Sequence, residues 1–100
     1  MAMVAVSISP GGVGPSVGVY VAEALRVLQA QDEVRWEVGP MFTTLEGDLR
    51  RIFDLVLAME EAVFAMGCER VGTVLKVDDR RDQPLSIEGK LARVQGLLGD

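Results

Sequence analysis

The central segment VGPMFTTLEGD, residues 38–48, predicts the end of one strand, a turn, a second strand and the start of a helix. Pro40 has a fixed φ angle and no amide hydrogen, so regular strand pairing is expected to stop there. Residues 42–45 are aromatic, β-branched and apolar, which suits a short strand that extends to Glu46. Because only three residues separate them from the alternating run at residues 34–38, we expect an antiparallel hairpin.

The flanking sequence predicts two further strands and two amphipathic helices. Residues 2–9 and 71–77 alternate in side-chain character, as strands with one buried face do. Residues 15–30 and 47–66 carry apolar side chains at spacings of three and four, which is typical of helices packed on one side. Gly67 then suits a left-handed helix C-cap.

A last helix is expected after Ser86, which suits its N-cap. Its apolar stripe consists of Ile87, Leu91, Val94 and Leu98. Gly89 and Gly96 weaken this helix by roughly 1 kcal/mol each relative to alanine. We therefore expect the helix to persist only where it docks on something else.

The order strand, helix, strand, strand, helix, strand predicts an α+β domain of the ferredoxin-like kind. Right-handed crossovers give a four-stranded antiparallel sheet with both main helices on one face and the last helix as an addition. We expect residues 1–100 to form one domain. The other face would expose small and apolar side chains such as Met3 and Ala5, which favours self-association.

Composition excludes several function classes. The chain has 15 acidic and 10 basic residues, a net charge of −5, which disfavours nucleic-acid binding. It has no histidine, so histidine-dependent nucleophile systems and histidine-based zinc sites are excluded. Cys68 is the only cysteine, so no internal disulfide forms. We expect no catalytic residue, no metal and no cofactor.

The first 22 residues carry no charged side chain, which raises the question of a signal peptide or a membrane segment. No basic residue precedes the apolar run, and prolines and glycines interrupt it before about 20 apolar residues accumulate. We therefore expect no membrane association and a cytoplasmic location, which the single cysteine also favours.

Short motifs along nearly the whole chain resemble the thiamine-binding protein family. They are Ser7-Ile8-Ser9-Pro10 with the glycine-rich loop after it, Ser16-Val17, Tyr20-Val21-Ala22, Pro40-Met41, Thr43, Glu46-Gly47, Arg70-Val71, Lys76-Val77-Asp78, Arg80, Ile87 and Lys90. The resemblance implies a ferredoxin-like fold, assembly into dimers and tetramers through sheets, and binding of thiamine or its pyrimidine part in some members.

The family pattern at the centre is Pro-Met-Gly-Thr-x-x-Glu-Gly, and Phe42 replaces its first glycine here. If that glycine leaves room for a ligand, Phe42 fills the room or offers a stacking surface. If it needs a positive φ angle, Phe42 is strained.

The resemblance implies candidate ligand-binding residues at the hairpin and on the first strand. Thiamine carries a cationic thiazolium and a flat aminopyrimidine, so a carboxylate, hydroxyl groups and an aromatic ring suit it. We expect Thr43, Thr44 and Glu46 to converge at one rim where protomers meet. The candidate ligand-binding residues are Ser7, Ser9, Trp36, Phe42, Thr43, Thr44 and Glu46; the structural or interface candidates are Pro40, Met41, Gly47 and Arg80.

Each candidate also has a purely structural interpretation. Glu46 can serve a helix N-terminus, the threonines can be plain strand residues, and Trp36 can be a core or interface residue. Arg80 can pair with Asp78 or Asp82.

We predict a non-catalytic binding protein for thiamine or a related pyrimidine, acting as a homodimer or homotetramer. The alternative is an interaction protein whose hairpin mainly builds the oligomer. An enzyme with Glu46 as general base is a further hypothesis.

Overall fold

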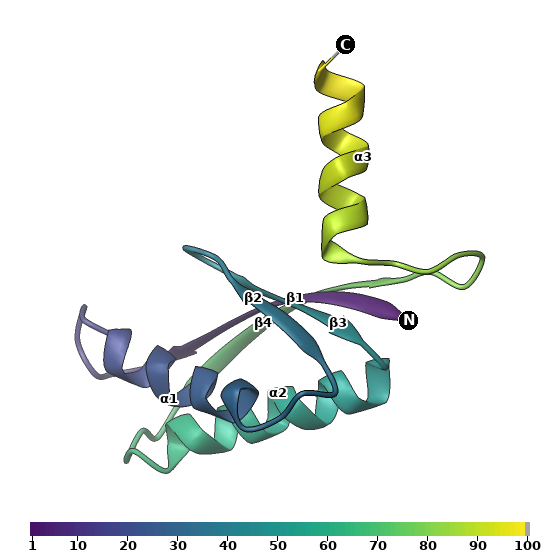
Figure 1. The fold of residues 1–100 in the computed structure, drawn as a ribbon. Helices are drawn as coiled ribbons and strands as arrows, with labels where there is room; N and C mark the ends of the chain where they lie inside the picture. Colours follow the sequence, from purple (N-terminus) through teal and green to yellow (C-terminus); the bar gives the residue numbers. More distant parts are fainter. Residues whose placement is uncertain (100) are drawn as a thin grey trace.

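The computed structural model describes residues 1–99 and has the ferredoxin-like βαββαβ order with an additional C-terminal helix. Its elements are β1 (Ala2–Pro10), α1 (Gly18–Gln29), β2 (Arg35–Val38), β3 (Thr43–Gly47), α2 (Leu49–Phe64), β4 (Val71–Asp79) and α3 (Ile87–Gly99). The strands form one antiparallel sheet in the order β2-β3-β1-β4. Helices α1 and α2 cover one face of the sheet, and α3 rises from the other face (Figure 1). The predicted fold class is confirmed.

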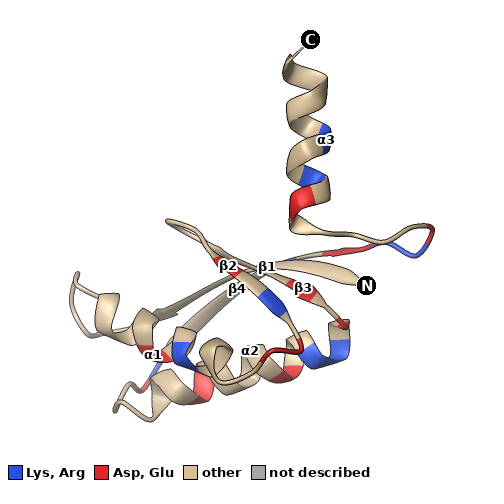
Figure 2. Ribbon diagram, in the orientation of Figure 1, with Lys and Arg blue, Asp and Glu red and all other residues tan. Residues whose placement is uncertain are grey.

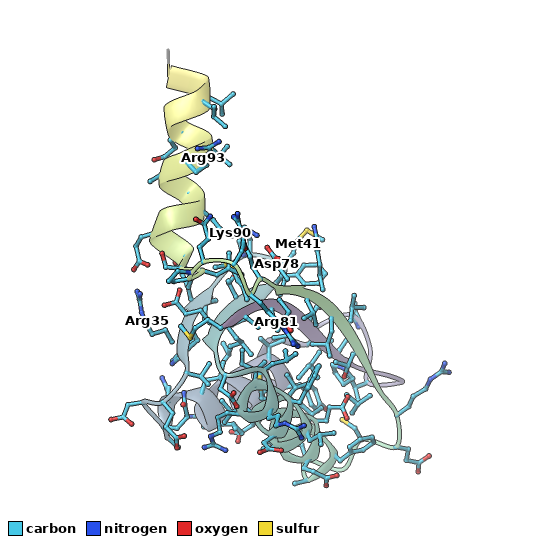
Figure 3. The ribbon with its side chains drawn as sticks, turned by 90° about the vertical axis from the view of Figure 1, so that its right-hand side faces the viewer. Arg35, Met41, Asp78, Arg81, Lys90 and Arg93 are labelled. Carbon is cyan, nitrogen blue, oxygen red and sulfur yellow. The ribbon has the colours of Figure 1, made fainter. Side chains whose placement is uncertain are left out.

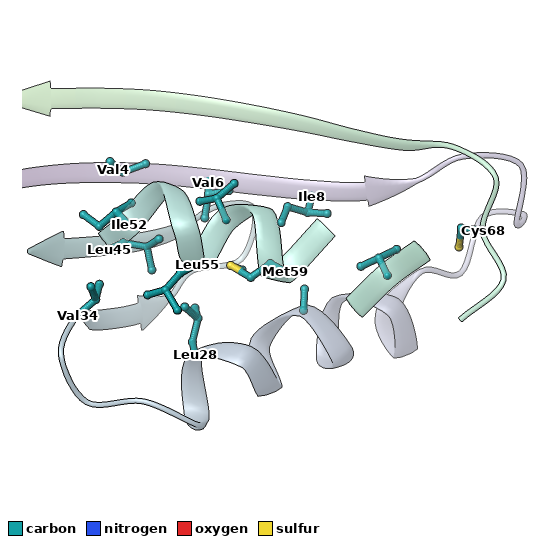
Figure 4. Close-up of a cluster of buried hydrophobic side chains, with 13 residues drawn as sticks. Val4, Val6, Ile8, Leu28, Val34, Leu45, Ile52, Leu55, Met59 and Cys68 are labelled. Atoms are coloured by element: carbon teal, nitrogen blue, oxygen red, sulfur yellow. The ribbon is translucent and has the colours of Figure 1, made fainter. Parts of the chain in front are cut away.

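The core lies between the sheet and the two covering helices (Figure 4). From β1, alternate residues Val4, Val6 and Ile8 are buried, as the two-residue period of a strand requires. They pack with Leu45 of β3 and with a set of helical side chains. That set consists of Ala24, Leu28, Ile52, Leu55, Val56, Met59 and Val63.

The strand β1 has two partners of unequal length. It pairs with β4 from Ala2 to Pro10, but with β3 only from Ala2 to Val6, which lies opposite Thr43. Beyond Val6, no strand formed by residues 1–99 lies on the β3 side of β1. The sheet is therefore notched beside the last residues of β1, next to the β2–β3 hairpin.

The hairpin turn is closed by a hydrogen bond of 2.9 Å from the Gly39 amide to the Phe42 carbonyl oxygen. A Cβ atom on Gly39 would lie 2.5 Å from that oxygen, so only glycine fits at this position. Phe42 precedes β3 instead of opening it. Within residues 1–99, positive φ angles occur only at glycines, so the backbone strain considered for Phe42 is absent.

Two helix starts follow different local rules. Helix α1 begins at Gly18, three residues later than the sequence predicts, because the preceding loop turns at Gly12 (φ 76°) and Gly14 (φ 89°). Helix α2 begins after Asp48, whose carboxylate accepts a hydrogen bond of 3.0 Å from the Arg51 amide. No helix within the described residues has the length and apolar character needed to cross a membrane.

Helix α3 has the predicted N-cap but little packing. The Ser86 hydroxyl accepts a hydrogen bond of 2.9 Å from the Gly89 amide. Ile87 is the one residue of the helix that is buried among those described. The predicted docking is therefore confined to the first turn, and the rest of the helix projects away from the sheet (Figure 1).

Candidate functional site

The hairpin sends neighbouring candidate residues to opposite faces of the sheet. Thr43 lies opposite Val6 and Val38, on the side covered by helices, whereas Thr44 lies opposite Ala5 and Glu37 on the open face. Side chains alternate along a strand, so two adjacent hydroxyls cannot share one rim. The expected convergence of the two threonines is therefore wrong.

A first cleft, which we call the α1-side cleft, occupies the notch where β3 begins beside β1. It encloses about 220 Å³, and Ser7, Ser9 and Thr43 are among the residues that line it. Thr43 lies on the helix-covered side, whereas Ser7 and Ser9 alternate with the buried residues of β1, so their side chains lie on the open side and their backbone borders the notch. Its remaining walls are mainly apolar: Val17, Val21, Ala24 and Leu25 from the α1 side, Pro40 and Met41 from the hairpin, and Met59 from α2. Thr43 is only 8% exposed, so its hydroxyl belongs to the interior of this notch.

A second cleft, which we call the open-face cleft, lies on the other face between the hairpin and the base of α3. It encloses about 340 Å³ and is lined by Met3, Glu37, Val38, Gly39, Thr44, Ile87, Lys90 and Leu91. The Lys90 ammonium pairs with the Asp78 carboxylate at 2.6 Å, and the two side chains lie beside each other below α3 (Figure 3).

Glu46 is held by two partners on the open face. Its side chain faces away from the core, and the residue is 5% exposed. One carboxylate oxygen accepts from Arg35 at 3.0 Å, and the other accepts from the backbone amide of Ile87 at 2.6 Å. Glu46 therefore serves a helix N-terminus, as one interpretation of the sequence holds, but the helix is α3 and not the adjacent α2.

Arg35 joins this arrangement to Glu88 in the first turn of α3. Its guanidinium donates to both carboxylate oxygens of Glu88, one of them at 3.0 Å. These hydrogen bonds lower the pKa of Glu88 to about 2, and the two carboxylates raise the pKa of Arg35. We call Arg35, Glu46, Glu88 and the Ile87 amide the α3 latch.

The two aromatic candidates lie outside both clefts. Trp36 lies opposite Leu45 and packs against the core on the helix-covered side. Phe42 is partly exposed at the hairpin tip. Neither residue is among those that line the two clefts, so stacking on a ring bound there needs other groups.

The structural candidates have local explanations. Gly47 has a φ angle of 154°, and a Cβ atom there would lie 3.3 Å from Val34. Arg80 pairs with Asp82 through contacts of 2.5 and 2.9 Å, which is one of the two pairings considered from the sequence. This contact lowers the pKa of Asp82.

Both charged residues that line the two clefts were missed as site candidates from the sequence. Glu37 and Lys90 both line the open-face cleft. The hairpin register, which sets Glu37 opposite Thr44, is the signal that could have identified Glu37. Lys90 is among the residues that carry the family resemblance, but no strand register predicts its place in the cleft, because its position depends on how α3 sits on the sheet.

The residues that line the two clefts can provide hydrogen bonds and apolar contacts. In the described part of the chain, no three cysteine or acidic side chains gather closely enough to hold a metal ion. No acidic or basic side chain is among the residues that line the α1-side cleft. The arrangement suits recognition of a small, flat and partly polar molecule.

The sandwich and its two clefts define a ferredoxin-like domain with space for a small ligand beside the central hairpin. By sequence, the chain belongs to the thiamine-binding protein family, whose model matches residues 4–95.

Individual relatives and solved structures agree with this assignment. The chain is 39% identical to the UPF0045 protein YqgV of Bacillus subtilis, with 94% of each sequence covered. The crystal structure of MJ1052 from Methanocaldococcus jannaschii superposes with a TM-score of 0.86 at 36% identity, covering 93% of this chain and 94% of that one. The structure of TM0486 from Thermotoga maritima, at 22% identity, shares the fold with a TM-score of 0.77, covering 93% of this chain and 97% of that one.

Proposed function

We propose that this protein binds thiamine or a related pyrimidine without chemical turnover, as a homodimer or homotetramer. The pyrimidine ring occupies the α1-side cleft. Membership of the thiamine-binding protein family supports the class of ligand. A buried free thiol at Cys68 supports a cytoplasmic location, where thiols stay reduced.

The observation that carries the proposal is a buried hydroxyl beside an unpaired strand edge in one apolar notch. The Thr43 hydroxyl can both donate and accept, and the backbone of Ser7 and Ser9 borders the same cleft on the side of β1 that β3 leaves unpaired. An aminopyrimidine presents ring nitrogen acceptors and an amino donor, which a hydroxyl and backbone N–H and C=O groups match. The apolar walls provide contact for the faces of the ring.

The size of the α1-side cleft limits what it can hold. A volume of about 220 Å³ suits one substituted ring and not a larger ligand. The cationic thiazolium then extends past the exposed Met41 toward solvent. The net charge of −5 favours a cation near the surface through the overall field of the protein. Glu46 takes no part, because it is buried on the opposite face of the sheet from the α1-side cleft, where it holds Arg35 and the Ile87 amide.

Calorimetric titration with thiamine and with its isolated aminopyrimidine tests the proposal. Two neighbouring substitutions provide a matched comparison: Thr43→Val alters the α1-side cleft, and Thr44→Val alters the open-face cleft. Loss of a buried hydrogen bond of about 1–1.5 kcal/mol corresponds to roughly tenfold weaker binding. We expect this loss for Thr43→Val and unchanged affinity for Thr44→Val.

Two results would contradict the proposal. Weaker binding by Thr44→Val alone would show that the ligand occupies the open-face cleft and not the α1-side cleft. Absence of binding to folded wild-type protein at millimolar ligand would remove this class of ligand altogether.

The α3 latch favours the second candidate, an interaction protein that builds an oligomer. It fixes a largely exposed helix at one end, which is an arrangement suited to contact with another chain. This role and ligand binding use different faces of the sheet, so they are compatible.

A further inference from the structure

A further groove, which we call the α3 groove, lies between helix α3 and the loop that joins it to β4. It encloses about 730 Å³, within the range of about 300–1,000 Å³ that small-molecule sites occupy. Gly89, Lys90 and Arg93 follow at helical spacings and line it from α3, whereas residues of the 80–86 segment line the opposite side. Because α3 rises from the face that α1 and α2 leave uncovered, the α3 groove lies apart from the α1-side cleft (Figure 1).

The α3 groove is basic although the chain as a whole is acidic. Three cationic side chains line it, and among residues 1–99 the one acidic lining residue is Asp78; the cations are Arg80, Lys90 and Arg93. The net charge of the whole chain is −5, so this positive charge is a local feature. Figure 2 shows the basic positions on α3 and in the loop below it. Since like charges repel one another when they are brought together, the groove favours an anionic occupant.

Two of the three cations are held in place by carboxylates. The Lys90 ammonium pairs with Asp78 at 2.6 Å, and the Arg80 guanidinium pairs with Asp82 through contacts of 2.5 and 2.9 Å. Such pairs limit the conformational freedom that these side chains lose when a ligand binds. Arg93 forms no ion pair within residues 1–99, so its guanidinium can bind an external anion.

A phosphate group suits these three cations better than a carboxylate does. A phosphate monoester carries a charge of about −1.5 to −2 at neutral pH and has three terminal oxygens. An arginine fork can pair with two of these oxygens, and a lysine ammonium can donate to another. Lys90 and Arg93 are three residues apart and share one side of α3, with Lys90 between Arg93 and Asp78 in Figure 3. Arg80 lines the groove from the loop, so the cations approach from two sides.

We propose that the α3 groove binds a small phosphate ester, whose phosphate is held by Arg93, Lys90 and Arg80. The organic part of the ester packs against the apolar residues of the groove, which are Pro84, Leu85 and Val94. The α3 groove is more than three times as large as the α1-side cleft, at about 730 Å³ against 220 Å³, which leaves room for a ring beside the phosphate. This second site is independent of the thiamine site and goes beyond the function proposed above.

The surroundings of the groove favour a single phosphate over a nucleic-acid backbone. Asp79 and Asp82 flank Arg80 in the loop, and Glu88 lies on the neighbouring side of α3, where Arg35 holds it. Nucleic-acid sites need a longer continuous basic surface than this groove provides. The positive charge therefore ends within the dimensions of one small ligand.

Titration of the full chain with phenyl phosphate, followed through amide chemical shifts, tests the site. This probe joins an ester phosphate to one apolar ring. We expect saturable binding in the millimolar range or tighter, with the largest shifts at Gly89, Lys90 and Arg93. Phenyl sulfate is the matched ligand, because it has the same ring and three terminal oxygens but a single negative charge. We expect it to bind roughly tenfold more weakly, since it loses one charge beside three cations.

Two arginine substitutions provide the matched variants. Arg93→Gln removes the cation that has no carboxylate partner, and it should weaken phenyl phosphate binding about tenfold. Arg26→Gln makes the same change at an arginine of α1 whose side chain is 64% exposed and which lies outside the α3 groove. It should bind phenyl phosphate like the wild type, because both variants change the net charge equally. Circular dichroism verifies that each variant is folded.

Several results would overturn the proposal. They are no saturation of folded wild-type protein by millimolar phenyl phosphate, unchanged affinity in Arg93→Gln, and equal weakening in Arg26→Gln. Equally tight binding of phenyl sulfate would contradict the need for a doubly charged phosphate. Equally tight binding of inorganic phosphate would contradict the role of the apolar residues.

The outcome is separable from that of thiamine binding. Thr43→Val, in the α1-side cleft, should leave the affinity for phenyl phosphate unchanged, and Arg93→Gln should leave the affinity for thiamine unchanged. Failure of one proposal therefore leaves the other standing.

Discussion

Glu46 joins two parts of the chain that are 41 residues apart in sequence. It accepts the Ile87 amide at the start of α3 and the Arg35 guanidinium from the neighbouring strand. Its sequence context, just before a helix, suggests a role at the nearest N-terminus. Asp48 performs that role instead, because Glu46 points to the open face of the sheet.

Glu46→Ala should lower the free energy of unfolding by about 1–3 kcal/mol, because the Ile87 amide loses its acceptor where water has little access. Urea unfolding measures this change. Glu37→Ala, on the exposed edge strand β2, is the control and should stay within about 0.5 kcal/mol of the wild type. Equal effects of the two substitutions would refute the role assigned to Glu46.

Thr43 and Thr44 show what residue identity predicts and what it does not. Both were predicted as candidates from their types and their place at the hairpin. Their faces follow from strand register, which a shift of one residue would reverse. The register depends on the Gly39–Phe42 turn, where β3 starts at Thr43 and not at Phe42.

At the scale of elements, the contact of Arg35 with Glu88 makes the α3 latch sensitive to acid. The lowered pKa of Glu88 means that the folded state favours its ionised form. The stabilisation is therefore complete above the ordinary value of 4.5, and it is lost as pH falls through about 2.

NMR titration of the Glu88 carboxyl carbon should give a midpoint near 2 in the wild type. In Arg35→Gln the midpoint should return toward 4.5, because the hydrogen bonds from the guanidinium are the main cause of the shift. A wild-type midpoint near 4.5 would show that Arg35 and Glu88 do not pair in solution.

The glycines of α3 allow a matched test of its local stability. Gly96→Ala should stabilise the helix by about 0.5–1 kcal/mol, because a Cβ atom there meets nothing within 4 Å. Gly89→Ala should give no such gain, since its Cβ would lie 2.8 Å from the capping Ser86 hydroxyl. Amide hydrogen exchange across α3 measures both. Equal protection in the two variants would contradict this account.

Local sequence patterns predicted most of the helices and strands. Where they failed, contacts between residues distant in sequence determine the structure. The alternation of β1 and the stripe of α2 were visible because each follows its own period. The later start of α1 could not be foreseen, since Pro15 is compatible with a first helical turn. Ser86 was identified because its hydroxyl acts within three residues.

At the scale of the whole molecule, the element order sufficed for the ferredoxin-like fold. The position of α3 did not follow from it, because that position depends on contacts between Arg35, Glu46 and residues 87–88. The clefts could not be predicted from the sequence either, since each combines β-strand, hairpin and helix residues that are distant in sequence.

The central claim of the proposal is that the ligand occupies the α1-side cleft and not the open-face cleft. Amide chemical shifts recorded during titration with the isolated aminopyrimidine of thiamine test this claim most directly. We predict that the largest changes occur at Ser7, Ser9 and Thr43, while Glu37, Thr44 and Leu91 stay unchanged. The opposite distribution, with shifts centred on Thr44 and Leu91, would contradict the account.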